Sequence, residues 1–371
     1  MLNGERIRQA REIRGWTQTE LSRRIDACQS AIAQYEGGTS IPTQEKIEAI
    51  AFQTGFPVSF FRQGDAVDFP LGSLLFRAKA SMASVDKNRV RQYGGLFFEA
   101  VENMESRLTK VPVRIPRLAG VPEEAARITR SELGLSPNGP VDLLVRPIEM
   151  AGGLVLALPM DIDEHDAFSL WIGRESPRPV MVVSTDGPGD RARFNIAHEL
   201  GHLVLHYQVT GNLKTLDDEA NRFAAEFLMP KEAIEQEIIP PVTLMGLQRL
   251  GLRWKVSVQA LMYRSRALGI TSQRQNVYLN QQLSKLGLKK KSLVDVLVER
   301  PRAFRQMAEL IYGDPIDCRQ MASELNIPLP MLLEAMSRYS EKNKALYAPE
   351  KAEEGGNGKL VQFVKRDGET A

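Results

Sequence analysis

The sequence predicts a multidomain protein that is mainly helical and contains one section of mixed α+β structure. Its 371 residues are too many for one ordinary hydrophobic core, so several domains are expected. Both ends of the chain show the spacing and capping signals of short helices. Short apolar runs bounded by glycine, proline and aspartate, which are typical of strands, gather in the middle of the chain.

The composition excludes several classes of protein. With 43% hydrophobic and 25% charged residues, the chain has the balance of a soluble globular protein. The formal net charge is only +2, so any nucleic-acid site must be a local patch. The two cysteines, Cys28 and Cys318, suggest neither a disulfide framework nor a zinc knuckle. Because we find no apolar leader and no run long enough to span a membrane, we expect a cytoplasmic protein with no membrane partner.

Residues 1–65 are expected to form a domain of short helices. Thr17 and Glu20 have the spacing of a capping box at the start of one of them. The sequence Gly55-Phe56-Pro57 signals a turn that ends the run. Residues 66–119 are expected to form a helical linker, because a helix over about 85–108 carries charges of both signs that indicate a solvated face.

Residues 120–271 are expected to form the α+β domain. Its expected elements are a helix over 123–133, strands over 154–158, 168–172 and 180–183, helices over about 191–207 and 216–228, and helical pieces around 242–267. Residues 272–340 are expected to form a small helical C-terminal region with breaks at 313–315 and 328–330. The lysine-, glutamate- and glycine-rich residues 341–371 predict a disordered tail.

The sharpest local signal is the H-E-x-x-H sequence His198-Glu199-Leu200-Gly201-His202. Residues four apart share one face of a helix, so the two imidazoles can bind one ion. The rest of this predicted helix is mostly apolar, which indicates a buried helix whose histidines and carboxylate need a partner. Zinc, which suits neutral imidazole nitrogens, would provide one. The alternative is a surface helix on which the motif arose by chance.

His206 falls in the same wedge of this helix. It lies a further turn along, about 6 Å beyond His202, so one ion is not expected to reach all three imidazoles. We interpret His206 as an end-of-helix residue, or at most as a hydrogen-bond donor to a transition state.

The following predicted helix offers a third ligand. Asp217 borders its apolar stripe, so we favour Asp217 as the metal ligand and keep Glu219 as the alternative. Asn221, one turn after Asp217, is placed to hold a ligand imidazole through its other ring nitrogen. Glu219 and Glu226 lie on the opposite side with Arg222 between them, a spacing that predicts exposed ion pairs.

Two blocks of this region, RFNIAHELGH over 193–202 and EANRFAAEFLMP over 219–230, resemble the ImmA/IrrE metallopeptidase family. The second block makes the resemblance more specific than H-E-x-x-H alone, and the resemblance covers about 120–270. It implies a thermolysin-like, zincin-type α+β domain with a small sheet. It also implies an acidic third ligand four residues before the asparagine, where Asp217 stands, and cleavage of a regulatory protein that is commonly a transcriptional repressor.

These parts predict a mechanism. Zn2+ on His198, His202 and Asp217 would lower the pKa of a bound water toward neutrality. Glu199, beside the metal but not a ligand, would take the proton of that water as general base and pass it to the leaving amine. A strand over 180–183, if it is a sheet edge, could hold the substrate chain by strand addition.

The N-terminal residues over 7–12, 15–22 and 29–36 resemble the helix-turn-helix of lambda-repressor-like (XRE) regulators. The resemblance implies that 29–35 is a recognition helix in the major groove. Gln29, Ser30 and Gln34 are then the residues expected to contact DNA, since glutamine can pair bidentately with adenine. Gln18, at the start of the preceding helix, is expected to hold a phosphate.

Further residues of this motif have expected structural or phosphate-binding roles. Leu21, Ile25 and Ile32 are expected to pack its core, and Arg6, Arg8 or Arg11 to contact phosphates. At the turn the sequence departs from the family: Asp26 tolerates a left-handed conformation, but Cys28 is a poor N-cap. Because the charges of this domain balance, a helical protein-interaction module that does not bind DNA is the alternative.

The combined reading is a DNA-binding transcriptional regulator with a zinc-dependent endopeptidase domain. Its expected partners are a double-stranded DNA operator and a protein substrate, a transcriptional repressor. A homodimer is the expected assembly, because two half-sites multiply affinity. The alternative function is a non-proteolytic transcription factor whose zinc domain senses a ligand or a partner; the intact Glu199 favours the peptidase, because a structural site needs no base beside its metal.

Overall fold

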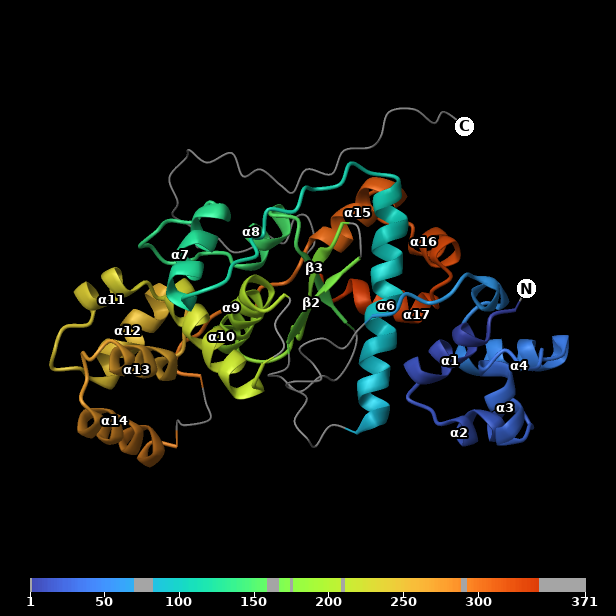
Figure 1. Cartoon of the computed structure of the whole chain (residues 1–371), viewed down its shortest axis with the longest axis horizontal. Coiled ribbons are helices and arrows are strands. Elements are labelled where there is room, and N and C mark those ends of the chain that lie inside the picture. Colours follow the sequence, from blue (N-terminus) through green and yellow to red (C-terminus); the bar gives the residue numbers. More distant parts are fainter. Residues whose placement is uncertain are drawn as a thin grey trace.

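The computed structural model describes residues 2–69, 83–158, 167–173, 176–207, 211–287 and 292–339. Within these ranges the chain is mainly helical and contains a small sheet in its middle section, as the sequence predicts (Figure 1). The expected tail over 341–371 lies outside the described residues. None of the helices in the described ranges is long and apolar enough to cross a membrane.

The strands and most of the helices follow the order expected from the sequence, whereas the helices over 145–150 and 231–237 were not predicted. The N-terminal section contains α1 (Gly4–Ile13), α2 (Gln18–Arg24), α3 (Gln29–Glu36), α4 (Gln44–Thr54) and the 3-10 helix η1 (Val58–Arg62), and the long helix α6 (Ser84–Ser106) follows. The middle section contains α7 (Pro122–Glu132), α8 (Val145–Met150), β1 (Leu154–Ala157), β2 (Phe168–Ile172), β3 (Arg178–Val183), α9 (Gly189–Leu205), α10 (Leu213–Leu228), α11 (Lys231–Glu237), α12 (Leu244–Trp254), α13 (Val258–Ala267) and α14 (Gln273–Lys285). The last described section contains α15 (Ala303–Tyr312), α16 (Cys318–Leu325) and α17 (Leu329–Met336), separated at the two predicted breaks.

The three strands form a mixed sheet in the order β1-β3-β2. β3 pairs in parallel with β1, where Leu154 lies opposite Val180, and antiparallel with β2, where Phe168 lies opposite Val182. Strands pair with both sides of β3, so 180–183 does not meet the condition of a sheet edge on which its expected role in strand addition depended. Among the described strands, β1 and β2 are the outer ones.

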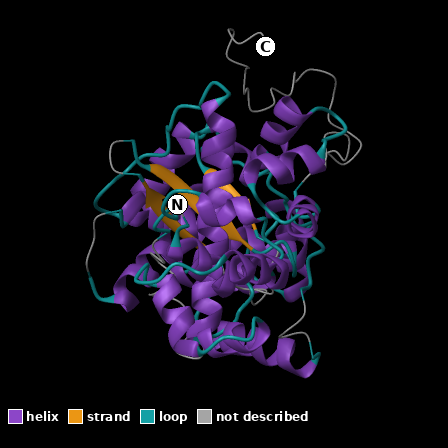
Figure 2. Ribbon diagram, turned by 90° about the vertical axis from the view of Figure 1, so that its right-hand side faces the viewer, coloured by secondary structure: helices purple, strands orange, loops and turns teal. Residues whose placement is uncertain are grey.

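Side chains alternate between the two faces of the sheet, and each face belongs to a different hydrophobic core. Phe168 and Leu170 of β2 belong to a core that also contains residues of α6, which we call the α6 core. Met181 and Val183 of β3 belong to a second core built on α9 and α10, which we call the α9 core. Figure 2 shows the strands enclosed by helices.

The helix α6 has the exposed charged residues that its sequence predicts, Asp86 and Glu102 among them, and a second face that is buried. Leu96, Phe97, Val101 and Met104 are buried on it, and Phe97 contacts the ring of Phe304 on α15. Some of its charged residues pair with neighbouring elements. Glu99, for example, accepts a hydrogen bond from Arg6 of α1, with 2.7 Å between Oε2 and Nη1.

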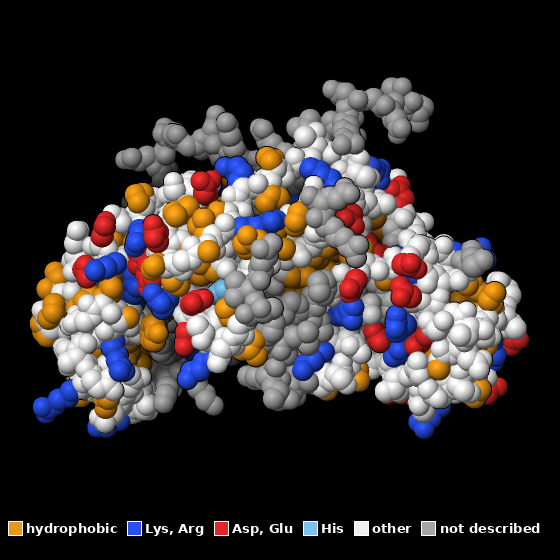
Figure 3. All heavy atoms as spheres, in the orientation of Figure 1, with side chains coloured by type: hydrophobic (Ala, Val, Ile, Leu, Met, Phe, Trp, Pro, Cys, Tyr) orange, Lys and Arg blue, Asp and Glu red, His pale blue; other side chains and the backbone are white. Residues whose placement is uncertain are grey.

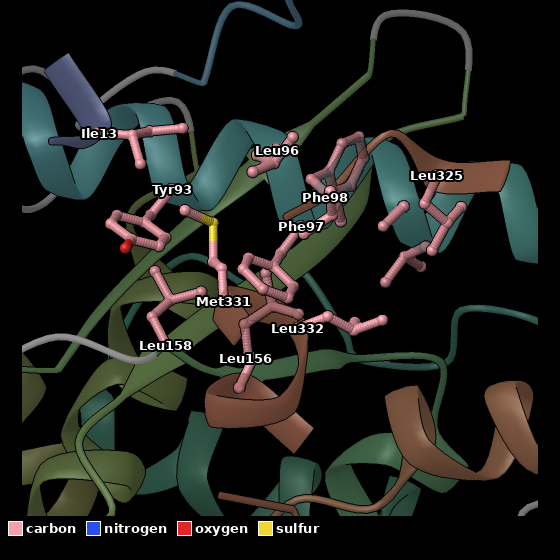
Figure 4. Close-up of a cluster of buried hydrophobic side chains, with 14 of the residues drawn as sticks. Ile13, Tyr93, Leu96, Phe97, Phe98, Leu156, Leu158, Leu325, Met331 and Leu332 are labelled. Atoms are coloured by element: carbon pink, nitrogen blue, oxygen red, sulfur yellow. The ribbon is translucent and has the colours of Figure 1, made fainter. Parts of the chain in front are cut away.

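The α6 core extends over sections that are far apart in the sequence. Figure 4 shows Ile13 of α1, Tyr93 of α6, Leu156 of β1 and Met331 of α17 in one cluster. Hydrophobic packing thus continues across the expected domain boundaries at 65, 119 and 271. The N-terminal helices, the sheet and the C-terminal helices share one core through α6.

Candidate metal centre and DNA-binding surface

The close packing of α9 and α10 builds the candidate metal centre. Ala220 and Ala224 of α10 are fully buried, as their small size predicts. A Cβ atom at Gly201 would lie 3.0 Å from the ring of Phe223, so glycine at this position lets α10 approach α9 closely. The two helices lie side by side (Figure 1). Asp217 and Glu219 in the first turns of α10 thereby meet histidines of α9.

Three predicted ligands converge at this contact. The Nε2 atoms of His198 and His202 are 3.0 Å apart, and Asp217 Oδ1 lies 3.5 Å from His198 Nε2. One ligand atom from each of the three residues lies within 4.8 Å of the others. His198 is 3% exposed, whereas the Asp217 side chain is 47% exposed, so the group opens to solvent on the aspartate side. Figure 3 shows histidine atoms reaching the surface beside acidic side chains.

Asn221 orients the first of these imidazoles. Its Oδ1 lies 2.8 Å from Nδ1 of His198, and its Nδ2 donates to Asp217 Oδ2 at 3.3 Å. Because an amide oxygen can only accept, the neutral ring of His198 carries its hydrogen on Nδ1. The lone pair on Nε2 then points at His202 and Asp217, and this is the donor chemistry that a zinc ion takes.

Glu199, the predicted general base, is fully buried beside this group. The Oγ atom of Ser169 lies 2.7 Å from Oε2 of Glu199 and 3.0 Å from the backbone oxygen of Glu199. Ser169 is a residue of this site that was not predicted from the sequence. The available signal was a polar residue between Phe168 and Leu170 in an otherwise apolar strand, which indicates a side chain with a specific partner.

The ion pairs expected on the far side of α10 are not formed. Arg222 pairs with Glu123 of α7 at 2.7 Å rather than with its neighbours on α10. Glu226 is buried and pairs with Arg264 of α13. Glu219 accepts a hydrogen bond from Nε2 of His206 at 2.9 Å. A helical wheel shows which side of α10 each residue lies on. The partners of these residues come from α7, α13 and the end of α9, which the wheel does not include.

The predicted DNA-contacting residues lie on one side of the helix-turn-helix. Gln29, Ser30 and Gln34 of α3 are exposed, whereas Ile32 is fully buried as expected. Gln29 Nε2 donates to Gln18 Oε1 at 2.6 Å, and Gln18 Nε2 donates to Glu36 at 2.9 Å. The two glutamines therefore form a hydrogen-bonded pair at the start of α2 and α3.

The turn between α2 and α3 has the conformation that its sequence suggests. Asp26 has a left-handed φ of 50°. Cys28 stands at the N-cap of α3 and makes no side-chain capping bond. Thr17 and Glu20 form the predicted capping box at the start of α2. Lys46 Nζ holds the turn itself by donating to the backbone oxygens of Ile25 and Asp26.

Two of the three arginines expected at phosphates are instead buried. Arg6 pairs with Glu99 and donates to the backbone oxygen of Gly64 at 2.8 Å. Arg11 pairs with Glu36, which raises the pKa of Arg11 above its ordinary value although burial alone would lower it. Only Arg8 of these three side chains is exposed. Arg6 and Arg11 form buried ion pairs that join separate helices. The pattern of charges along the sequence does not show which arginines are buried in this way.

Comparison with known protein families finds two matches. Residues 4–59 match the helix-turn-helix domain family, and residues 148–266 match the IrrE N-terminal-like domain, which is a peptidase family. The first match covers α1 to α4, and the second covers the sheet, α9 and α10 together with α11, α12 and most of α13. No curated protein matches this chain.

Proposed function

We propose that this chain, which carries a helix-turn-helix DNA-binding domain and an IrrE N-terminal-like domain of a peptidase family, is a transcriptional regulator with zinc-dependent endopeptidase activity. Its substrate is a regulatory protein, a transcriptional repressor. The observation that carries the proposal is the convergence of His198, His202 and Asp217 beside the buried carboxylate of Glu199.

The donor set fits zinc better than other common divalent ions. Two imidazole nitrogens and one carboxylate oxygen are zinc ligands, whereas calcium and magnesium prefer oxygen ligands alone. Three protein ligands also leave one position of a tetrahedral ion for water or substrate, as catalytic sites require. His198, His202 and Asp217 would hold the ion, with Asn221 fixing the ring of His198.

The chain's own residues supply the proton transfer. Zinc at this site would act as a Lewis acid that acidifies water and polarises a carbonyl group. Glu199 takes a proton from the attacking water on its carboxylate and passes it to the nitrogen of the leaving amine. Ser169 donates a hydrogen bond to Oε2 of Glu199 and so orients this carboxylate. The edge strand β2, which carries Ser169, is where an extended substrate would pair.

The N-terminal domain directs this activity to DNA. We place α3 in the major groove, with Gln29, Ser30 and Gln34 at base edges and Gln18 at a phosphate. The bond between Gln18 and Gln29 supports this role, because it prepositions the amide of Gln29 before DNA binds. A homodimer would present two such helices to two half-sites.

A second candidate function is a transcription factor whose metal domain senses a partner and does not cleave. The shared α6 core favours it, because a change at the sheet can reach α1 through packed side chains. In that case Glu199→Gln leaves both DNA binding and its regulation unchanged, and no cleaved protein is found.

Two measurements test the proposed function. Metal analysis of the full chain should find one zinc in the wild type and little in His198→Ala or Asp217→Ala; a wild type that takes up no zinc refutes the metal centre. If Asp217→Ala keeps its zinc, Glu219 replaces Asp217 as the ligand to test. Labelling of new protein N-termini in cells should then detect cleavage with the wild type and not with Glu199→Gln. The exposed Glu132→Gln serves as the matched control.

A further inference from the structure

The two histidines of the candidate metal centre are held in similar ways by different partners. His198 is held by Asn221, as described above. On the other side, Nδ1 of His202 lies 2.9 Å from Nδ1 of His206, and Nε2 of His206 lies 2.9 Å from Oε2 of Glu219. His206 is the C-cap residue of α9, and its side chain is only 6% exposed.

The chemistry of these groups fixes the direction of each hydrogen bond. A carboxylate can only accept, so the neutral ring of His206 carries its hydrogen on Nε2 and donates it to Glu219. Nδ1 of His206 is then an acceptor, and it receives the hydrogen on Nδ1 of His202. The lone pair of His202 is thereby left on Nε2, the atom that lies 3.0 Å from Nε2 of His198.

This arrangement excludes His206 as a ligand to the same ion. Its Nδ1 faces the Nδ1 side of His202, whereas the ligand atom of His202 is Nε2 on the opposite side of the ring. The arrangement also explains why Glu219 does not pair with Arg222 on its own helix. Arg222 makes two hydrogen bonds to Glu123 of α7, with Nε and Nη2 at 2.8 and 2.7 Å from the carboxylate.

We propose that His206 and Glu219 act as a positioning pair for His202. They fix its tautomer and ring orientation, and the carboxylate polarises His202 toward the ion through the ring of His206. The inference rests on the proposed function, because it takes His198, His202 and Asp217 as the residues that hold the metal. Groups of this kind around metal sites change affinity by about 10- to 100-fold when they are removed.

The test is the zinc affinity of the full chain, measured by competition with a chromophoric chelator. We expect His206→Leu and Glu219→Ala to bind zinc about 10- to 100-fold more weakly than the wild type. Asp218→Ala, an exposed acidic residue next to Asp217, is the matched control and should bind as the wild type does. Circular dichroism of the metal-free proteins verifies that each variant is folded.

A conservative variant separates hydrogen bonding from packing. The Oδ1 atom of asparagine can replace Nδ1 of His206 as an acceptor, but asparagine has no counterpart of Nε2 to donate to Glu219, so His206→Asn should recover only part of the affinity that His206→Leu loses. Cobalt in place of zinc should give a visible spectrum that changes in His206→Leu and is partly restored in His206→Asn. If the wild type binds zinc and both His206→Leu and Glu219→Ala bind it equally well, the positioning pair is refuted while the metal centre stands. If the wild type binds no zinc, the proposed function itself fails.

Discussion

Ser169 of β2 lies 2.7 Å from Oε2 of Glu199 on α9 and donates a hydrogen bond to it. The contact joins the edge strand of the sheet to the predicted general base. Its neighbours Phe168 and Leu170 point the other way, into the α6 core. One strand therefore touches both the candidate metal centre and the packing that supports the DNA-binding domain.

The bond between Ser169 and Glu199 should appear as a coupling energy. Removing the hydroxyl with Ser169→Ala leaves a buried carboxylate with one partner fewer, which costs about 1–3 kcal/mol of unfolding free energy. Ser169→Ala, Glu199→Gln and the double variant form a cycle that isolates the pair. The measurement is urea unfolding with a chelator present, so that metal binding does not contribute. Strictly additive effects would show that the two side chains do not interact in solution.

Zinc should stabilise the wild type and not a variant that lacks a ligand. At about 1,000 times the dissociation constant, a ligand that binds only the folded state adds about 4 kcal/mol. We expect this increase in the unfolding free energy of the wild type and of Asp218→Ala, and a much smaller one in Asp217→Ala. Thermal unfolding with zinc and with a chelator measures it. Equal stabilisation of Asp217→Ala would remove Asp217 from the ligand set.

Gln29→Ala should weaken sequence-specific DNA binding. Loss of a bidentate contact to a base costs about 1–3 kcal/mol of discrimination. The duplexes that the wild type selects from random DNA are the probe, and binding is compared with an unrelated duplex at one salt concentration. Gln320→Ala, an exposed glutamine of α16, is the matched control. Unchanged specificity in Gln29→Ala would favour a protein-interaction role for α3.

Glu149 should make the stability of the protein depend on pH. Burial raises its pKa from 4.5 to about 7, although the backbone N–H groups of Arg302 and Ala303 at the start of α15 donate to its carboxylate and oppose the rise. A folded-state pKa above the unfolded value means that the folded state holds the proton more tightly. Stability from this group is therefore complete below about pH 4.5 and is lost as the pH rises to about 7, by up to about 3 kcal/mol.

Unfolding by urea at several pH values checks this dependence. The difference in unfolding free energy between the wild type and Glu149→Gln should shift across pH 4.5–7 and stay constant above it. The exposed Glu132→Gln should follow the wild type throughout. A constant difference between the wild type and Glu149→Gln over the whole range would contradict the raised pKa.

The shared α6 core predicts that the DNA-binding section does not unfold by itself. Phe97→Ala removes a fully buried ring and should lower the free energy of unfolding by about 3–5 kcal/mol, whereas Phe52→Ala, at a side chain that is 84% exposed, should leave it almost unchanged.

Single-tryptophan variants that keep Trp16 or Trp254 report separately on unfolding at the N-terminal helices and at α12. Coincident unfolding midpoints are expected; an earlier transition at Trp16 would show that the DNA-binding section is independent.

Much of the candidate site could be predicted from local sequence. H-E-x-x-H spacing places His198 and His202 on one helical face, and the hydrogen bond between Asn221 and His198 agrees with the one-turn offset from Asp217. The strands over 168–172 and 180–183 also form where their apolar runs predict. These features depend only on residues that are close together in the sequence, because the repeat of one helix or strand fixes which of its side chains share a face.

Other features depended on elements that meet only in the folded chain. The order of the strands made 180–183 central rather than an edge. Arg6 and Arg11 look like phosphate contacts in sequence, but Glu99 and Glu36 bury them as ion pairs. The charges on α6 indicate a solvated face, but only the fold shows that its other face packs against α1 and α15 in the core.

The sequence by itself determined most of the helices, the three strands, the capping box at Thr17 and the pair of histidines, because each follows from propensity and periodicity within one segment. Tertiary structure alone decided that Ser169 reaches Glu199 and that His206 joins Glu219 to His202. A helix or strand has a fixed repeat, so its own faces can be read from its residues. Which face meets which neighbour depends on how all the buried surfaces are covered together, and no single segment contains that information.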